Sequence, residues 1–188
     1  VLQNCMSHDR DGNVGIVDTG FDMPLPLPEE AGASLDLSPG SQRTSILEGK
    51  TTSTFAYRSN ILGPTIRAFR GEMLTASVQN ALSEPTNVHW HGLKVPANMD
   101  GNPVDIVKAG ESFQYSFPID QRAGTHWYHP HPHGATARQV HNGLAGMLII
   151  NDDEELALGL PAGDFEVPLV IQDKRLKAGK LVYDPSMM

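Results

Sequence analysis

The chain is poor in several features that would narrow its function. It has a single cysteine, Cys5, which excludes a disulfide within the chain, says little about redox compartment and could still pair with another chain. No apolar run is long enough to span a bilayer, since the longest, Gly143 to Ile150, has the length of a strand. Lysines and arginines do not cluster and the formal net charge is -8, so neither nucleic acid nor an anionic membrane is an expected partner. We therefore expect a soluble chain with a solvated acidic surface.

The 188 residues are enough for one domain of ordinary size plus extra segments. Residues 1–47 are rich in Gly, Pro, Ser and Asp, and the alternating prolines at 24–28 favour extended or polyproline geometry. This composition predicts an extended N-terminal arm. Residues 9–13 resemble the start of a calcium loop, but the glycine falls two places early and Gly20 stands where a bidentate Glu is needed. We interpret them as a solvated turn.

A period of two begins beyond residue 47. Leu74, Ala76 and Val78 alternate with polar residues, and the aromatic side chains at 113–117 do the same, a pattern typical of half-buried strands. The continuous apolar run 144–150 favours a strand that is buried on both faces. Because turn signals separate these segments, we expect residues 48–153 to form one all-β domain, an antiparallel sandwich or barrel.

Residues 154–188 are expected to hold a linker and the start of a second domain. Leu160 to Gly163 is a loop by composition, and Val167 to Ile171 reads as a new strand. No closing element follows before Met188, so we expect an incomplete chain: a fragment, a cleaved chain or one that continues.

Two His-X-His pairs, His89 with His91 and His129 with His131, are the most informative feature of the sequence. Alternate residues of a strand project from the same face, so each pair presents two imidazoles together. Trp90 falls on the opposite face of the first pair, where it can anchor that strand in the core. Imidazole is neutral near pH 7 and binds borderline metals without a thiolate beside it. The pairs predict a metal site, and the ligand type alone leaves copper and zinc open.

The wider sequence around these pairs resembles a known family. Residues 87–93 (Asn-Val-His-Trp-His-Gly-Leu) and 127–134 (Trp-Tyr-His-Pro-His-Pro-His-Gly), with Asp100-Gly101 between them, resemble the first two copper-binding motifs of multicopper oxidases. Within this family, the motifs most resemble those of the bacterial copper efflux oxidase and of laccases and bilirubin oxidases. The likeness extends through residues 59–66 and 143–150.

This resemblance implies a cupredoxin-like Greek-key β-sandwich. It also implies that His89 would bind a type 2 copper, and that His91, His129 and His131 would bind a type 3 copper pair. Asp100 matches an acidic residue that in the efflux-oxidase branch helps deliver protons to oxygen, and the alternative is a simple turn residue.

By the same resemblance, the chain would supply only half of the histidines of a trinuclear copper cluster. The other half and the type 1 copper would come from a C-terminal portion on a second or continuing chain. Together they would couple one-electron oxidation of phenols, aromatic amines, bilirubin-like pigments or Cu(I) to four-electron reduction of dioxygen to water. The reducing substrate stays open, because it docks near the type 1 copper. We expect a periplasmic or secreted protein, with a cytoplasmic one as the alternative.

Two other functions compete with this prediction. A copper-binding or structural module without turnover would explain the absent type 1 site, whereas a zinc hydrolase lacks a convincing general base in either histidine motif. His133 could lie beside the copper ligands or at the surface, and we interpret His126 and His141 as structural. Trp90 and Trp127 are predicted to support the core.

Overall fold

The computed structural model describes residues 5–8, 14–17, 27–58 and 61–187. The chain divides into two compact units, one formed by residues 1–27 with 161–170 and the other by residues 28–160 with 171–188. The segment 9–13, interpreted above as a turn, lies outside the described residues.

The first unit contains one hairpin within the part of the chain that is described. Its strands β1 and β2 are antiparallel, with Cys5 opposite Val17, and span Cys5–His8 and Val14–Val17. The same unit includes the short 3₁₀ helix η2, Gly163–Phe165.

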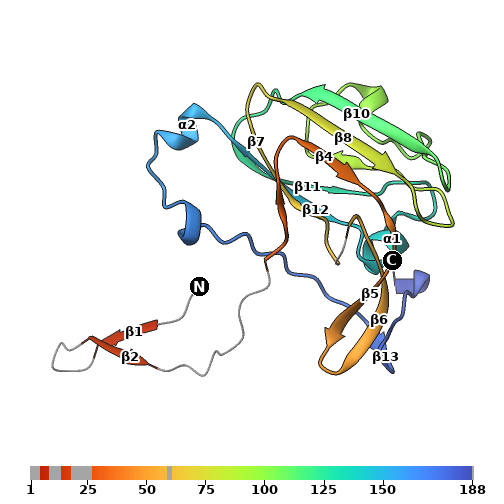
Figure 1. Cartoon of the computed structure of the whole chain (residues 1–188), viewed down its shortest axis with the longest axis horizontal. Helices are drawn as coiled ribbons and strands as arrows, with labels where there is room; N and C mark the ends of the chain where they lie inside the picture. Colours follow the sequence, from red (N-terminus) through yellow and green to blue (C-terminus); the bar gives the residue numbers. More distant parts are fainter. Residues whose placement is uncertain (1–4, 9–13, 18–26, 59–60, 188) are drawn as a thin grey trace. The chain divides into compact units, whose positions relative to one another are not determined.

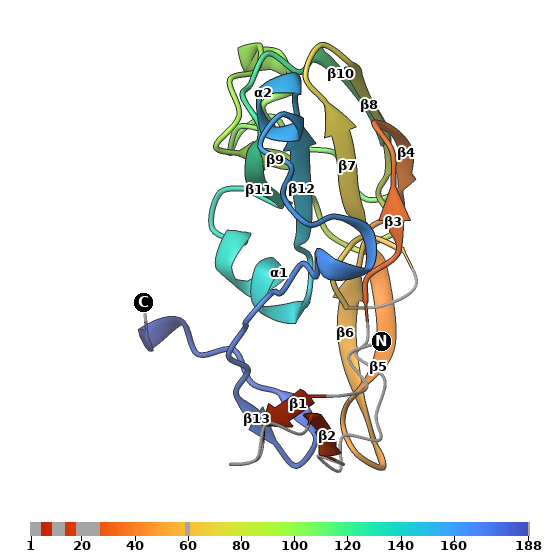
Figure 2. The same cartoon turned by 90° about the vertical axis from the view of Figure 1, so that its left-hand side faces the viewer.

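The second unit is built around a five-stranded sheet with the strand order β3-β7-β12-β11-β9, which Figure 2 shows from one side. These strands span, in that order, Glu30–Ala31, Thr65–Phe69, Gly146–Asn151, Gly124–His129 and His89–His91. Strand β7 pairs in parallel with β3 and β12, whereas β11 is antiparallel to both β12 and β9. Strand β9 therefore lies at one edge of the sheet.

A second, three-stranded sheet has the order β10-β8-β4, and its strands lie side by side in the upper part of Figure 1. They span Ser112–Pro118, Met73–Gln79 and Ser34–Leu37. Leu74, Ala76 and Val78 of β8 are buried, which confirms the alternation in the sequence. The same alternation holds for β10 only in part, because Phe113 is exposed while Tyr115 and Phe117 are buried.

One hydrophobic core lies between the two sheets. At its centre Trp90 of β9 is fully buried, with its ring centroid 5.7 Å from that of Tyr115 and 5.4 Å from that of Phe117 on the other sheet. Aromatic rings at these separations contribute attraction beyond their buried area. The predictions of an all-β sandwich and of Trp90 as a core support are confirmed.

The prediction of an arm through residue 47 is wrong for residues 28–47. Strands β3 and β4 belong to the two sheets, and Leu35 and Leu37 are part of the core. The next segment forms a hairpin of β5 and β6, Gly40–Leu47 and Lys50–Ala56. Four residues that alternate polar and apolar, Ser34–Leu37, are enough to complete a sheet when a neighbouring strand offers its edge.

The expected first strand of a second domain is also wrong, because Val167 to Ile171 is not in a strand and Ile171 is 87% exposed. Residues 171–188 belong to the second unit and contain two short strands, β13 and β14, and the 3₁₀ helix η3: Leu176–Lys177, Lys180–Leu181 and Pro185–Met187. The hydroxyl of Thr52 in β6 donates a hydrogen bond of 2.8 Å to the carbonyl of Gly179. This contact joins the C-terminal segment to the β5–β6 hairpin.

The helices of the second unit are short: η1, α1 and α2 span Ala97–Met99, Thr136–Asn142 and Asp153–Leu156. Helix α1 follows the second histidine motif, and Lys174 Nζ donates to the carbonyls of Val140 and His141 in its last turn. Such a cation satisfies carbonyls that lack a partner within the helix. None of the helices in the described parts of the chain could cross a membrane, by length and apolarity.

Candidate metal centre

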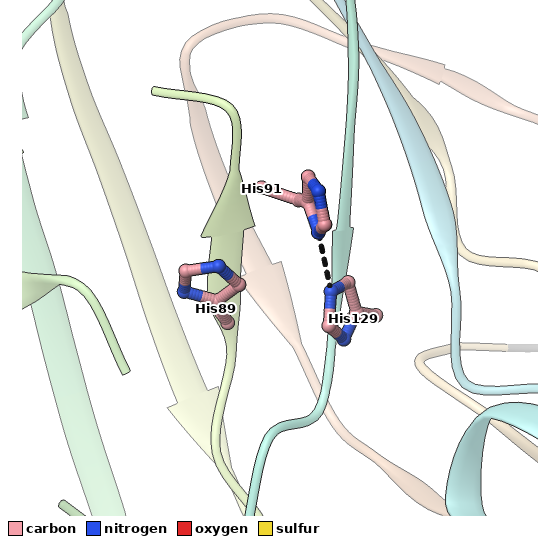
Figure 3. Close-up of side chains that lie close together, drawn as sticks. All are labelled: His89, His91 and His129. Atoms are coloured by element: carbon pink, nitrogen blue, oxygen red, sulfur yellow. Dashed lines mark hydrogen bonds between the residues drawn. The ribbon is translucent and has the colours of Figure 1, made fainter. Parts of the chain in front are cut away.

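The two histidine motifs lie on neighbouring strands. In the antiparallel register of β9 and β11, His89 is opposite His129 and His91 is opposite Trp127. Figure 3 shows His89 and His91 on β9 and His129 on β11, with the three rings close together. Within the described residues these three histidines form one group whose ligand atoms all lie within 4.8 Å of one another. The sequence predicted which face each side chain takes, and the fold adds that the two strands are adjacent.

Burial of the alternate residues determines which way the histidines point. Val88 and Trp90 are fully buried, so His89 and His91 project from the opposite face of β9. Figure 2 shows β9 and β11 next to each other at one side of the sheet. Burial of Val88 and Trp90 in the core therefore determines the direction in which the two imidazoles of β9 point.

Nδ1 of His91 and Nε2 of His129 are 3.1 Å apart, the contact drawn as a dashed line in Figure 3. Two imidazole nitrogens bound to one ion at about 2.0 Å would stand roughly 3 Å apart. The spacing of these two nitrogens therefore fits one shared metal ion.

Backbone carbonyls fix the ring orientation of two of the histidines. Nδ1 of His89 lies 2.7 Å from the carbonyl oxygen of Asp100, and Nδ1 of His129 lies 2.9 Å from that of Pro130. Because a carbonyl oxygen can only accept, each Nδ1 carries the hydrogen and donates it. In the neutral ring Nε2 is then the nitrogen with a free lone pair, the form that binds a metal.

Burial also keeps His129 neutral. Its side chain is largely removed from water, and this burial, together with repulsion from the neighbouring imidazoles of His89, His91 and His131, lowers its pKa to about 4. The carbonyl of Pro130 opposes this shift without reversing it. At pH 7 His129 is therefore in the unprotonated state that a metal ligand requires.

His131 lies beyond the end of β11, beside the other rings but outside the group of three. Its ring centroid is 5.2 Å from that of His89 and 5.8 Å from that of His129. Nδ1 of His131 is 3.4 Å from the hydroxyl of Thr136 at the start of α1. The four predicted histidines are thus brought to one side of the sheet edge, three of them in mutual contact range.

Asp100 is adjacent to this cluster. It follows η1 directly and precedes Gly101, which has a φ of 62°, so it does occupy a turn. Its carboxylate oxygen Oδ1 lies 3.2 Å from Nδ1 of His89. The His89 N–H is taken by the main-chain carbonyl of the same aspartate, so Oδ1 is buried without a hydrogen-bond partner. Asp100 therefore both occupies a turn and lies beside the histidine cluster.

The prediction that Trp127 supports the core is wrong. Its side chain is 38% exposed, and its ring stacks on His129 with a centroid separation of 4.1 Å and an interplanar angle of 29°. It also tilts over His91, with the centroids 4.9 Å apart. Two-residue spacing puts Trp127 on the same face as His129, and that face carries the histidines predicted to bind a metal.

The remaining histidines of the second unit are at or near its surface. His133 is exposed, so of its two predicted positions, beside the copper ligands or at the surface, it has the second. His126 and His141 are partly buried, and burial lowers the pKa of each. His141 packs against Tyr183, with the ring centroids 5.9 Å apart.

One buried residue of the first motif had no predicted role. Asn87 is fully buried and makes side-chain hydrogen bonds to the loop that follows Asp100 and to His131. The sequence signal was an amide two residues before the first histidine, but its partners lie 14 to 44 residues further along the chain. Fold and site together define a β-sandwich protein with a cluster of histidines at a sheet edge that could hold a metal ion.

Comparison with known proteins identifies the family. A family model described as multicopper oxidase matches residues 40–155. The multicopper oxidase mco of Staphylococcus aureus is 39% identical over 141 residues, which cover 75% of this chain and 32% of that protein. The cell division protein FtsP of Escherichia coli (strain K12) is 34% identical over 163 residues, 84% of this chain and 35% of that protein. The chain belongs to the multicopper oxidase family, and its fold is the cupredoxin-like β-sandwich that this family predicts.

Solved structures agree with this assignment. The laccase-like multicopper oxidase CueO from Ochrobactrum sp. matches with a TM-score of 0.80 and 39% identity, over 86% of this chain and 38% of that chain. McoA from Aquifex aeolicus matches with a TM-score of 0.77 and 37% identity, over 87% and 38%. The chain thus spans 32% to 38% of the length of these relatives. Copper is the metal that the family implies, and the imidazole cluster is compatible with it.

Proposed function

We propose that this chain supplies the N-terminal half of the ligands of a trinuclear copper cluster in a multicopper oxidase. The whole enzyme would take single electrons from a reductant and reduce dioxygen to water. The observation that carries the proposal is the cluster of His89, His91 and His129, whose ligand atoms lie within 4.8 Å of one another on two adjacent strands. Membership of the multicopper oxidase family supports the same function.

In this proposal His89 binds the type 2 copper, and His91, His129 and His131 bind the type 3 pair. The 3.1 Å spacing of the His91 and His129 nitrogens supports one ion shared by these two residues. The carbonyl of Asp100 supports the role of His89, because it leaves Nε2 of that ring free to bind.

Copper would supply the redox chemistry, passing electrons to oxygen without release of partly reduced products. The protein's part is to hold the ligands neutral and to provide protons. We propose that Asp100 provides them. Its Oδ1 atom is buried, faces the histidine cluster and has no hydrogen-bond partner, so it could exchange a proton with a group bound there.

The electron-entry site belongs to the proposed partner. The one cysteine of the chain, Cys5, lacks the His-Cys-His context of a type 1 copper. A C-terminal portion, on a second or continuing chain, would carry that copper and the remaining histidines. Phenols, aromatic amines, bilirubin-like pigments and Cu(I) are the proposed reductants, and a periplasmic or secreted location is part of the same proposal.

Oxygen consumption and copper content of the intact protein, with everything that copurifies, test this proposal. We expect bound copper and an oxygen uptake that depends on an added phenol or Cu(I). Electron paramagnetic resonance separates copper from zinc. A preparation that includes both portions and still binds no copper would contradict the proposal.

A second candidate is a copper-binding or structural module without turnover. The match to the cell division protein FtsP favours this candidate, because that protein is named for a role in cell division and not for an oxidase activity. FtsP also matches a longer part of this chain than the staphylococcal oxidase does. All four histidines are present here, which speaks against a purely structural role. Bound copper without any oxygen consumption in the intact protein would support this second candidate.

A further inference from the structure

We infer that Asn87 is a positioning residue that sets the place of His131 relative to His89 by docking the second histidine motif onto the loop that follows Asp100. The inference rests on the proposed function, because the site it positions is the proposed copper site. It adds a role for a residue that is not itself a ligand.

The side-chain amide of Asn87 holds the loop that follows Asp100. Asn87 is fully buried, and its Nδ2 group lies 3.0 Å from the carbonyl of Gly101, 2.8 Å from that of Asn102 and 3.2 Å from that of Asp105. The two hydrogens of this amide thus serve three carbonyls of a single loop, one of them being shared between two carbonyls. The loop begins at the aspartate whose carbonyl accepts from His89, so fixing the loop also fixes that contact.

The other end of the same amide holds His131. Its Oδ1 atom accepts the backbone N–H of His131 at 2.6 Å. A second hydrogen bond follows two residues later, from the N–H of His133 to the carbonyl of Pro103 at 3.1 Å. Residues 131–133 are therefore tied to the loop twice, once through Asn87 and once directly.

These two ties matter because the other hydrogen bonds of the segment, from Ala135 and Thr136 to the carbonyl of Pro132 and between Thr136 and the His131 ring, are local to the start of α1. Strand β11 ends at His129, so the sheet no longer fixes the backbone beyond it. Pro130 and Pro132 have no N–H to donate. The N–H groups of His131 and His133 are the two that this stretch has left, and the first donates to Asn87 while the second donates directly to the loop.

A second buried asparagine shows what a purely structural role looks like. Asn80 is also fully buried, donates from Nδ2 to the carbonyls of Glu84 and Val107 at 2.8 Å each, and accepts the N–H of Leu82 at 2.9 Å. Its side chain has the same chemistry and a comparable set of hydrogen bonds, but none of these reaches a histidine. Asn80 is therefore a matched control.

The experiment compares Asn87→Ala, Asn87→Ser and Asn80→Ala in the intact protein with its C-terminal portion, using Cu(II) alone as the probe. Three quantities are measured: the thermal midpoint, the Cu(II) affinity by competition with a chelator, and the Cu(II) paramagnetic resonance spectrum. We expect all three variants to lower the thermal midpoint. The Asn87 variants alone should weaken Cu(II) binding, by about 10- to 100-fold, and change the spectrum.

The serine variant keeps the measurement possible if the alanine variant does not fold, because its hydroxyl can keep one hydrogen bond but cannot reach both sides. An Asn87→Ser protein with wild-type Cu(II) affinity and spectrum, and a thermal midpoint lowered as in Asn80→Ala, would overturn the inference. A wild-type preparation that includes both portions and binds no Cu(II) would overturn the proposed function and this inference with it.

Discussion

The main-chain carbonyl of Asp100 accepts the Nδ1 hydrogen of His89 at 2.7 Å, while Oδ1 of the same aspartate lies 3.2 Å from that nitrogen without hydrogen bonding to it. One residue thus offers two separate groups to the same imidazole. The carbonyl fixes which nitrogen of His89 is free to bind a metal, and the carboxylate remains available for proton exchange. Substitution of the side chain should therefore separate metal binding from turnover.

Asp100→Asn should leave copper content unchanged and slow oxygen reduction. The carbonyl that orients His89 remains, whereas the amide cannot carry a proton to oxygen. We expect a rate loss of about 100-fold or more, from the usual size of general acid catalysis, together with an altered pH profile. Copper analysis and oxygen uptake on the same preparation measure both effects. Equal turnover in the two proteins would remove Asp100 from the proton pathway.

Gly101→Ala should destabilise the fold more than Gly110→Ala. Both glycines have positive φ, 62° and 79°, so each alanine meets backbone strain of about 1 kcal/mol. A Cβ at Gly101 would also stand 2.0 Å from the carbonyl oxygen of Val88, whereas nothing lies within 4 Å at Gly110. We expect a loss of about 3 kcal/mol or more at Gly101, measured by denaturant unfolding. Similar losses for the two variants would show that the loop relaxes freely around Val88.

Trp127 should report metal binding through its fluorescence. Its indole stacks on the ring of His129 and tilts over His91, at centroid distances of 4.1 and 4.9 Å. Cu(II) at these rings should quench its emission strongly, while Zn(II), which has no partly filled d shell, should not. Fluorescence titrations of the wild type and of Trp127→Phe provide the measurement. If the variant, which retains Trp90, loses the same emission intensity on Cu(II) addition as the wild type, the quenched tryptophan is not Trp127.

The metal-free chain should lose stability as the pH falls from about 6.5 to about 4. Burial lowers the pKa of His129 from 6.5 to about 4, so the unfolded chain takes up this proton first and acid favours unfolding. The contribution is fully present above pH 6.5 and is lost as the pH falls towards the folded-state pKa. The same direction applies to His126 and His141, whose pKa values burial also lowers.

Thermal unfolding between pH 7 and pH 4 measures this dependence. His129→Gln should flatten the slope in that window, whereas substitution of the exposed His133 serves as the control. A slope unchanged by His129→Gln would mean that this imidazole is not the group that titrates.

The face on which each histidine projects could be predicted from the sequence, because alternation along a strand is a local property. His89 and His91 oppose Val88 and Trp90 in the sequence as they do in the fold. The pairing of His89 with His129 is not local, since it depends on which strands become neighbours. Only the resemblance to a known family indicated it.

Two segment predictions that rested on local composition are wrong. Leu35 and Leu37 lie in a stretch whose glycines and prolines mask a four-residue strand, and that strand forms by parallel pairing with β8. Val167 to Ile171 has the local composition of a strand but does not form one. For Ser34–Leu37 a partner distant in the chain determines the outcome, and composition carries no information about it.

At the site, the positions of Trp127 and Asn87 also could not be predicted fully from the sequence. The face of Trp127 followed from its spacing to His129, yet aromatic residues are buried so often that the core interpretation was preferred. The role of Asn87 depends on carbonyls 14 to 18 residues away and on an N–H 44 residues away. Folding alone brings these groups together.

The full burial of Trp90 has a consequence for how the metal is loaded. Small zinc modules unfold when their ion is removed, because the ion itself provides the folding energy. Here Trp90 packs among aromatic side chains of the opposite sheet, and this core packing fixes β9. Demetallation should therefore leave an intact scaffold with empty imidazoles, and we expect copper to enter after folding is finished and to exchange without refolding.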